Sequence, residues 1–179
     1  MKVFLVRHGA TDAKGDVSLN EMGRKQAELL AKTLKVDFSR VYCSDLLRSK
    51  ETAEILNKEL GKELIVDDSL REFDEHFLVG EGTETEKKQF EKLEKFVAML
   101  HNKRESDERI LIVGHGVLNK IIIAKLFGLT LEQALFLKIY YCSKSVVKWG
   151  SKLNKPAWRI ESLNCCDHLP KDMIGCIPK

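Results

Sequence analysis

Proline is scarce in this chain of 179 residues, and its copies, Pro156, Pro170 and Pro178, all lie in the last quarter. No proline therefore interrupts regular structure in the first 150 residues. No apolar run is long enough to span a bilayer, and the first residues lack the pattern of a signal peptide. The formal net charge is only +3, too small to indicate nucleic acid as the main partner. We expect a soluble, cytoplasmic protein that binds neither a membrane nor nucleic acid.

The cysteine count also argues against a disulfide framework, because five is odd and no export signal is visible. Reduced thiols are the simpler interpretation. The segment Cys165-Cys166-Asp167-His168, followed by Cys176, matches no standard zinc spacing, so we interpret these thiols as buried or surface groups. We expect neither a metal nor a cofactor.

The chain contains short apolar runs that alternate with amphipathic stretches, and it has no repeat. The pattern predicts strands at 3–6, 40–43, 64–66, 110–113, 136–141, 145–149 and 158–163. It predicts helices at 20–35, from an N-cap at Ser44 to about Leu60, at 83–103, and at about 117–127. Because strands and helices alternate, we expect one α/β domain over residues 1–179. Helices should cover both faces of a mostly parallel sheet in three layers.

Two histidine motifs directly follow the two most apolar strands. Arg7-His8-Gly9 follows the first strand, and Gly114-His115-Gly116 follows the strand at 110–113. In open α/β sheets, ligands bind outside the carboxyl ends of the strands. If these strands are parallel neighbours, His8 and His115 face each other across one pocket. The flanking glycines would let the backbone turn sharply beside a ligand.

Two further charged residues follow the other predicted parallel strands. Arg48 lies in the first turn of the helix after strand 40–43, and its side chain should lean back toward the strand end. Glu72 follows strand 64–66 and should reach the same rim. Two arginines, two histidines and one acid suit phosphoryl transfer, in which catalysis is mostly positioning and electrostatic stabilisation.

The predicted mechanism is covalent. His8 would attack phosphorus as a neutral imidazole, and Glu72 would protonate the leaving oxygen and then deprotonate the attacking water. Asp74, Glu75 and Glu81 remain alternatives for this acid. We expect four basic side chains and one glycine to bind the substrate phosphate without a metal. These residues are Arg7, Arg48, His115, Lys14 and Gly116.

The same residues resemble the motifs of the histidine phosphatase (phosphoglycerate mutase-like) superfamily, in order and over nearly the whole chain. The matching segments are Arg7-His8-Gly9 with Thr11, Ser18 to Gly23 with Gln26-Ala27, Ser44 to Arg48 with Thr52-Ala53, Leu70-Arg71-Glu72, Gly114-His115-Gly116, and Leu163-Asn164 with His168-Leu169. The resemblance implies a phosphoglycerate mutase-like fold. It also implies catalytic roles for Arg7, His8, Arg48, Glu72 and His115.

Two features depart from the family pattern. Lys14 stands where members often carry an asparagine that helps to hold phosphate. Only about ten residues separate Glu72 from the helix at Thr83, whereas the mutases have a long insertion there that covers the substrate. A mutase must shield its phosphohistidine from water, so the short lid favours phosphomonoester hydrolysis.

Several alternatives stay open. The chain could act on phosphohistidine or phosphoprotein, it could be a cofactor-dependent phosphoglycerate mutase, or it could be a non-catalytic phosphate-binding module. A small phosphorylated metabolite is the expected partner. Its identity depends on residues 73–82 and on Lys14, Asp16 and Tyr141. The oligomeric state is not readable from the sequence, and a homodimer is one option.

Overall fold

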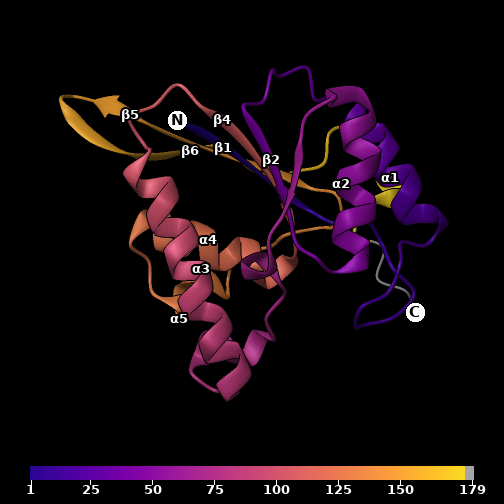
Figure 1. Ribbon diagram of the computed structural model, residues 1–179, viewed down its shortest axis with the longest axis horizontal. Helices are drawn as coiled ribbons and strands as arrows, with labels where there is room; N and C mark the ends of the chain where they lie inside the picture. Colours follow the sequence, from indigo (N-terminus) through magenta and orange to yellow (C-terminus); the bar gives the residue numbers. More distant parts are fainter. Residues whose placement is uncertain (176–179) are drawn as a thin grey trace.

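A six-stranded sheet in the order β3-β2-β4-β1-β5-β6 forms the centre of the computed structural model, which describes residues 1–175 (Figure 1). Its strands are β1 (Lys2–Arg7), β2 (Arg40–Cys43), β3 (Leu64–Val66), β4 (Arg109–Gly114), β5 (Lys144–Lys152) and β6 (Lys155–Cys165). β3, β2, β4 and β1 are parallel, whereas β5 and β6 are antiparallel and form a hairpin. The sheet is therefore mostly parallel, as the sequence predicts.

Helices cover both faces of the sheet. They are α1 (Glu21–Ala31), α2 (Leu47–Leu60), α3 (Glu84–Asn102), α4 (Gly116–Phe127) and α5 (Leu131–Ala134), with 3-10 helices η1 (Asp68–Leu70), η2 (Glu75–Val79) and η3 (Lys171–Met173). Figure 1 shows α1 and α2 on one side of the sheet and α3, α4 and α5 on the other. The three-layer α/β/α fold predicted from the sequence is confirmed.

Alternate residues of each strand supply two separate cores. Val3 and Leu5 of β1 pack toward α3 and α4, whereas Phe4 and Val6 pack toward α1 and α2. β4 does the same, because successive side chains of a strand point to opposite faces. This burial on both faces explains why both strands read as continuous apolar runs. The double burial holds the strand ends that carry the histidines in fixed positions.

The connection between Glu72 and α3 is short and closed at its base by one side chain. The carboxylate of Glu86 accepts the N–H of Asp74 at 2.9 Å and the N–H of Thr83 at 2.9 Å. Thr83 and Glu86 also form a capping box that starts α3. The connection contains the short helix η2, and it has no long insertion.

Two sequence predictions about local structure are wrong. Residues 136–141 form no strand, because β5 pairs with the free edge of β1 and leaves this segment without a partner strand. The segment instead lines the candidate site, as described below. Ser44 does not cap α2, which begins at Leu47 with Leu46 as its N-cap. The Ser44 hydroxyl accepts the Leu46 N–H at 3.3 Å in the turn before the helix.

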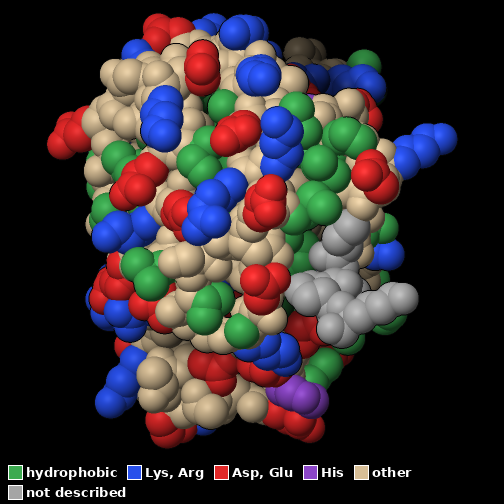
Figure 2. All heavy atoms as spheres, turned by 90° about the vertical axis from the view of Figure 1, so that its right-hand side faces the viewer, with side chains coloured by type: hydrophobic (Ala, Val, Ile, Leu, Met, Phe, Trp, Pro, Cys, Tyr) green, Lys and Arg blue, Asp and Glu red, His purple; other side chains and the backbone are tan. Residues whose placement is uncertain are grey.

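The cysteines within residues 1–175 form no disulfide, and Cys176 lies outside the described residues. Every helix in the described part of the chain is too short or too polar to cross a membrane. On the face shown in Figure 2, acidic and basic side chains are interspersed and do not form a large patch of one sign.

Candidate active site

The candidate active site lies at the carboxyl ends of β1, β4 and β2. The parallel register pairs Arg7 with Gly114, and the His8 N–H donates to the Gly114 carbonyl oxygen at 2.9 Å. A histidine follows each of these paired residues, so the two imidazoles leave neighbouring strands at the same level. The ring centroids of His8 and His115 lie 5.1 Å apart, and their planes make an angle of 63°. The fold thus brings the two histidines together.

Side chains of α1 and α2 fix the turn that follows the first histidine. The Gly9 N–H donates to the Thr52 hydroxyl at 3.1 Å, and the Ala10 N–H donates to the Gln26 side-chain oxygen at 2.9 Å. A Cβ at Gly9 would lie 2.4 Å from the Gly23 carbonyl oxygen, so only glycine fits there. These family-motif residues therefore act as the scaffold of the turn.

The hydrogen bonds of His8 define its tautomer. The Nε of Arg48, which can only donate, lies 3.1 Å from His8 Nε2, so Nε2 is the acceptor. The proton is therefore on Nδ1, which donates to the Gly9 carbonyl oxygen at 2.7 Å. Burial, followed by the positive charges of Arg7 and Arg48, lowers the pKa of His8 well below its usual value. His8 is thus a neutral imidazole with its lone pair on Nε2, the form that a nucleophile needs.

The two arginines come from different elements, Arg7 from the end of β1 and Arg48 from the first turn of α2. Arg48 is buried, and its Nη1 donates to the Gly15 carbonyl oxygen. Arg7 donates through Nη1 to the Ile139 carbonyl oxygen at 2.7 Å, and its guanidinium carbon lies 3.9 Å from the centroid of the Tyr141 ring. Each guanidinium is therefore held by a backbone carbonyl and keeps further N–H groups for an anion.

His115 is entirely buried, and neither of its ring nitrogens has a hydrogen-bond partner within residues 1–175. The Nε of Arg7 also lacks a partner there. Burial is the largest cause that lowers the pKa of His115, and its electrostatic interactions with His8, Arg48 and Arg7 act in the same direction. Buried polar groups normally have a partner, so these unpaired nitrogens beside His8 indicate a place for a bound anion.

Glu72 lies at the N-terminus of α4. Its carboxylate accepts the N–H groups of Gly116 at 2.9 Å, Val117 at 3.1 Å, Leu118 at 3.0 Å and Phe73 at 3.1 Å. Burial raises the pKa of Glu72, and the N–H donors and the arginines oppose this shift. An acid whose pKa is raised in this way keeps its proton to higher pH than an ordinary glutamic acid, which suits a proton donor.

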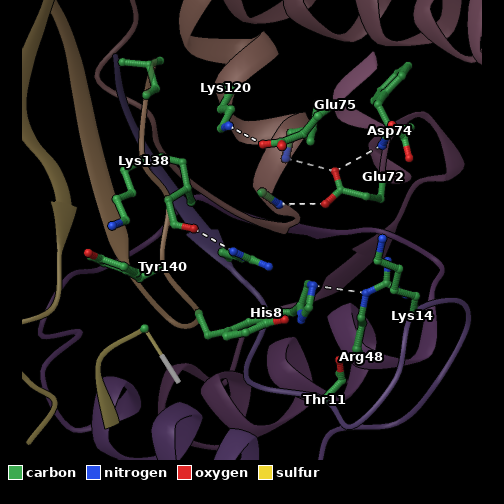
Figure 3. Close-up of a pocket in the computed structure, with 18 of the residues that line it drawn as sticks. His8, Thr11, Lys14, Arg48, Glu72, Asp74, Glu75, Lys120, Lys138 and Tyr140 are labelled. Carbon is green, nitrogen blue, oxygen red and sulfur yellow. Dashed lines mark hydrogen bonds and ion pairs between the residues drawn. The ribbon is translucent and has the colours of Figure 1, made fainter. Parts of the chain in front are cut away.

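These residues surround a cavity of about 850 Å³. Figure 3 shows His8 and Arg48 at one end of the cavity, with Glu72 on the opposite wall and Lys120 farther along. The predicted catalytic and phosphate-binding residues that line it are Arg7, His8, Lys14, Arg48, Glu72 and Gly116. The alternative acids Asp74 and Glu75 and the predicted substrate-contacting residue Tyr141 line it as well. His115 lies behind this lining against His8, without exposed surface.

Two of the predicted phosphate ligands are less well placed than the rest. Lys14 lines the cavity but is exposed, and no side-chain contact of Lys14 is seen among the described residues. The N–H of Gly116 already donates to Glu72. Gly116 also lies against Arg7, because a Cβ at this position would be 3.4 Å from the Arg7 guanidinium carbon, an ordinary contact distance.

The alternative acids Asp74, Glu75 and Glu81 each have a partner of their own. Asp74 accepts the His76 N–H at 3.0 Å and so caps η2. Glu75 pairs with Lys120 at 2.7 Å, and Glu81 lies 3.3 Å from the His76 ring, away from the cavity lining. Of these four acids, Glu72 is the one whose carboxylate contacts the start of α4, directly after His115.

Sequence reasoning missed Lys120, Lys138 and Tyr140, which also line the cavity. Lys138 and Tyr140 belong to the segment mistaken for a strand, and the Lys138 ammonium lies 4.8 Å from the Tyr140 ring centroid. Lys120 had a usable signal: it is a charged residue among the mostly apolar positions of the helix Gly116–Phe127. A charge placed among buried positions indicates a functional or paired group.

Known proteins resemble this chain along most of its length. The sequence matches the family described as "Histidine phosphatase superfamily (branch 1)" over residues 3–106 and 78–165. It is 28% identical over 204 residues to "Probable phosphoglycerate mutase GpmB" of Photorhabdus laumondii, with 94% of this chain and 95% of that protein covered. It is also 28% identical over 191 residues to "Uncharacterized phosphatase PhoE" of Bacillus subtilis, with 93% and 96% covered.

Solved structures share the fold. A mycobacterial glucosyl-3-phosphoglycerate phosphatase in complex with inorganic phosphate superposes with a TM-score of 0.75 at 23% identity, covering 94% of this chain and 99% of the other. A phosphoserine phosphatase mutant of Entamoeba histolytica gives a TM-score of 0.72 at 21% identity, covering 94% and 99%. At this level of identity the likeness concerns the fold. With the family match over most of its sequence, the chain belongs to the histidine phosphatase superfamily, whose phosphatase- or mutase-like chemistry is the function that this membership supports.

Proposed function

We propose that this chain is a phosphomonoester hydrolase that forms a phosphohistidine on His8. The observation that carries the proposal is the tautomer of His8, whose Nε2 lone pair is directed at the Arg48 guanidinium at 3.1 Å. A phosphate that entered between Arg7 and Arg48 would meet this lone pair. Phosphate and guanidinium groups form strong charge-assisted hydrogen bonds, so the anion can replace the bond between Arg48 and His8.

The proposed reaction has two displacements at phosphorus. In the first, the Nε2 lone pair of His8 forms the N–P bond while the bond to the leaving oxygen breaks, and protonated Glu72 gives that oxygen its proton. In the second, ionised Glu72 takes a proton from water, the water oxygen bonds to phosphorus, and the N–P electrons return to Nε2. Phosphate then leaves, and Glu72 is protonated again.

Fixed positive charge would stabilise both transition states. The guanidinium groups of Arg7 and Arg48 would contact the equatorial oxygens, where charge is concentrated in phosphoryl transfer. His115 is buried behind the lining, so its donor nitrogen would reach a phosphate oxygen only where the anion lies against His8. His115 is neutral in the resting site, so one of its nitrogens carries a hydrogen that can be donated. These side chains supply the charge that a metal ion supplies in other phosphatases, so we propose a reaction that needs no metal.

The choice of hydrolysis over mutase chemistry rests on the short connection between Glu72 and α3. It contains η2 and its flanking turns, so water can reach a phosphohistidine in the open cavity. One relative covering most of the chain is named as a mutase, which keeps mutase activity as the second candidate. A small phosphorylated metabolite is the proposed substrate, because the cavity is of the size that encloses such molecules.

The test is phosphate release from an aryl phosphate, measured with and without a chelator, with vanadate as an inhibitor. We expect activity that survives the chelator and is blocked by vanadate. Acid-labile phosphate should form on the wild-type protein during turnover and should be absent from the His8→Ala variant. Interconversion of phosphoglycerates without phosphate release would instead establish the mutase, and turnover by His8→Ala would overturn the proposed nucleophile.

A further inference from the structure

Lys120 is a buried cation that the proposed chemistry does not use. It lies on α4, a helix whose other residues are mostly apolar and buried. Its side chain is only 9% exposed, yet it lines the cavity. Burying an ammonium group is costly unless it is paired, so a lysine at this position requires an anion.

The carboxylate of Glu75, which now pairs with Lys120, is a partner that can be displaced. Glu75 of the short helix η2 contacts the Lys120 ammonium at 2.7 Å, but the Glu75 side chain is 62% exposed. The other acceptor seen among the described residues is the Leu135 carbonyl oxygen, at a long 3.4 Å. An exposed carboxylate gains little from an ion pair, because water solvates it nearly as well. The lysine is thus fixed in the wall, whereas its partner can be replaced.

The position of Lys120 relates it to the phosphate end of the cavity. Gly116 and Lys120 are four residues apart on α4, so they lie on the same face about 6 Å apart along the axis. Both line the cavity, and Gly116 lies against the Arg7 guanidinium. Helical side chains lean toward the N-terminus, which brings the Lys120 ammonium back toward this end.

The two other nearby acids, Glu72 and Asp74, have partners other than Lys120. The Glu72 carboxylate is held by N–H groups at the start of α4, and the Asp74 carboxylate caps η2. Figure 3 shows the Glu75 carboxylate beside the Lys120 ammonium, on the same side of the cavity as Glu72. If Glu75 turned out into water, Lys120 would be a buried cation facing the cavity without an acid.

We propose that Lys120 forms a second anion subsite that binds a carboxylate of the substrate, and that Glu75 occupies this subsite while it is empty. The inference rests on the proposed phosphatase function and narrows its substrate to phosphomonoesters with a carboxylate a few bonds from the phosphate. A carboxylate fits better than a second phosphate for two reasons. The group that now fills the place is itself a carboxylate, and one ammonium balances one negative charge.

The test compares two competitors of aryl phosphate hydrolysis, 3-phosphoglycerate and glycerol 3-phosphate, which differ in a carboxylate or a hydroxymethyl group. For the wild type we expect the inhibition constant of 3-phosphoglycerate to be lower by about tenfold, the effect of one charge-assisted hydrogen bond. Lys120→Met should remove this difference. Glu75→Gln should enlarge it, because the neutral amide competes less for Lys120.

Lys125→Met is the matched control. Lys125 lies on the same helix and pairs with Glu94 at 2.6 Å, but it does not line the cavity. It should leave both inhibition constants unchanged. Equal constants for the two competitors in the wild type, or a preference that persists in Lys120→Met, would overturn the subsite and leave the phosphatase proposal intact. A wild-type protein without aryl phosphatase activity would overturn both. Thermal melting checks that Lys120→Met is folded, and Glu75→Gln tests the idea independently of that variant.

Discussion

Arg48 donates its Nε hydrogen to Nε2 of His8 at 3.1 Å, and this bond sets the tautomer of the ring. The same guanidinium is held by the Gly15 carbonyl oxygen on the loop that follows β1. One side chain thus connects the nitrogen proposed as nucleophile to a wall of the cavity. A bound phosphate would exchange this internal bond for contacts of its own.

Replacing Arg48 by lysine should therefore weaken catalysis although the charge is kept. An ammonium cannot contact His8 and a phosphate in the fork geometry of a guanidinium. We expect kcat/KM for an aryl phosphate to fall by roughly 10- to 100-fold, the equivalent of one charge-assisted hydrogen bond. Arg71→Lys is the control, because Arg71 pairs with Asp45 at the surface outside the cavity lining. Equal losses in the two variants would contradict a specific role of Arg48.

The pH profile of kcat/KM should have its maximum on the acidic side of neutrality for an alkyl phosphate. His8 must be neutral, and its pKa is well below the usual value, so activity persists below the range in which a free histidine is protonated. Glu72 must be protonated for the first step, and burial raises its pKa. The rate therefore falls at the alkaline side as Glu72 ionises.

The variant Glu72→Gln tests this assignment. It should be much less active and should lack the alkaline fall, whereas Glu81→Gln, whose acid lies outside the cavity lining, should keep the wild-type profile. The substrate must be an alkyl phosphate, because a phenolate leaving group needs little protonation. Retention of the alkaline fall in Glu72→Gln would assign the proton to another acid.

Stability should decrease with acid because of the two buried histidines. Their pKa values are lowered in the folded protein, so the unfolded chain binds more protons as the pH falls below about 6.5. Each histidine then removes up to about 1.4 kcal/mol of unfolding free energy per pH unit. Glu72, with its raised pKa, acts in the opposite direction, because the folded protein holds that proton more tightly than the unfolded chain does.

Denaturant unfolding between pH 7 and pH 5 measures this dependence. His115→Gln should reduce the slope, because one of the two histidines is then absent and Glu72 still contributes equally. His101→Gln is the matched control at an exposed histidine on α3. An unchanged slope in His115→Gln would mean that His115 is protonated in the folded state.

Tyr141 should position Arg7 without taking part in proton transfer. Its ring lies 3.9 Å from the Arg7 guanidinium carbon and 5.5 Å, centroid to centroid, from the His8 ring. Tyr141→Phe keeps the ring and should bind inorganic phosphate as the wild type does. Tyr141→Leu should raise the phosphate inhibition constant about three- to tenfold, from the lost cation–π contact. If the phenylalanine variant lost as much, the hydroxyl would be the important group.

The sequence predicted the strands that carry the site better than the segment that closes it. β1 and β4 are buried on both faces and therefore have an unmistakable apolar pattern. The segment 136–141 also has apolar residues, but it packs them around a cavity and leaves Phe136 exposed. Periodicity alone cannot distinguish a cavity wall from a sheet edge, because both place apolar and polar residues in alternation.

The contacts of the site residues were predictable only in part. The position of Arg48 near His8 follows from strand order and helix direction. The hydrogen bonds that Glu72 accepts from three N–H groups of α4 could not be predicted in this way. They depend on the path that the loop after η1 takes back to the sheet. The pairing of Lys120 with Glu75 likewise joins residues that are 45 positions apart in the chain. Such long-range pairs have no local signal.

Because the Glu86 carboxylate binds both ends of the segment between Glu72 and α3, the length of this segment can change during evolution. Since both ends of residues 74–83 are fastened to one carboxylate, the length of the segment can vary without moving Glu72 or the start of α3. Doubling a loop of this kind costs only about 0.6 kcal/mol in closure entropy. A longer cover could therefore be inserted at this point, and substrate range and water access could diverge between descendants that share one unaltered reaction centre.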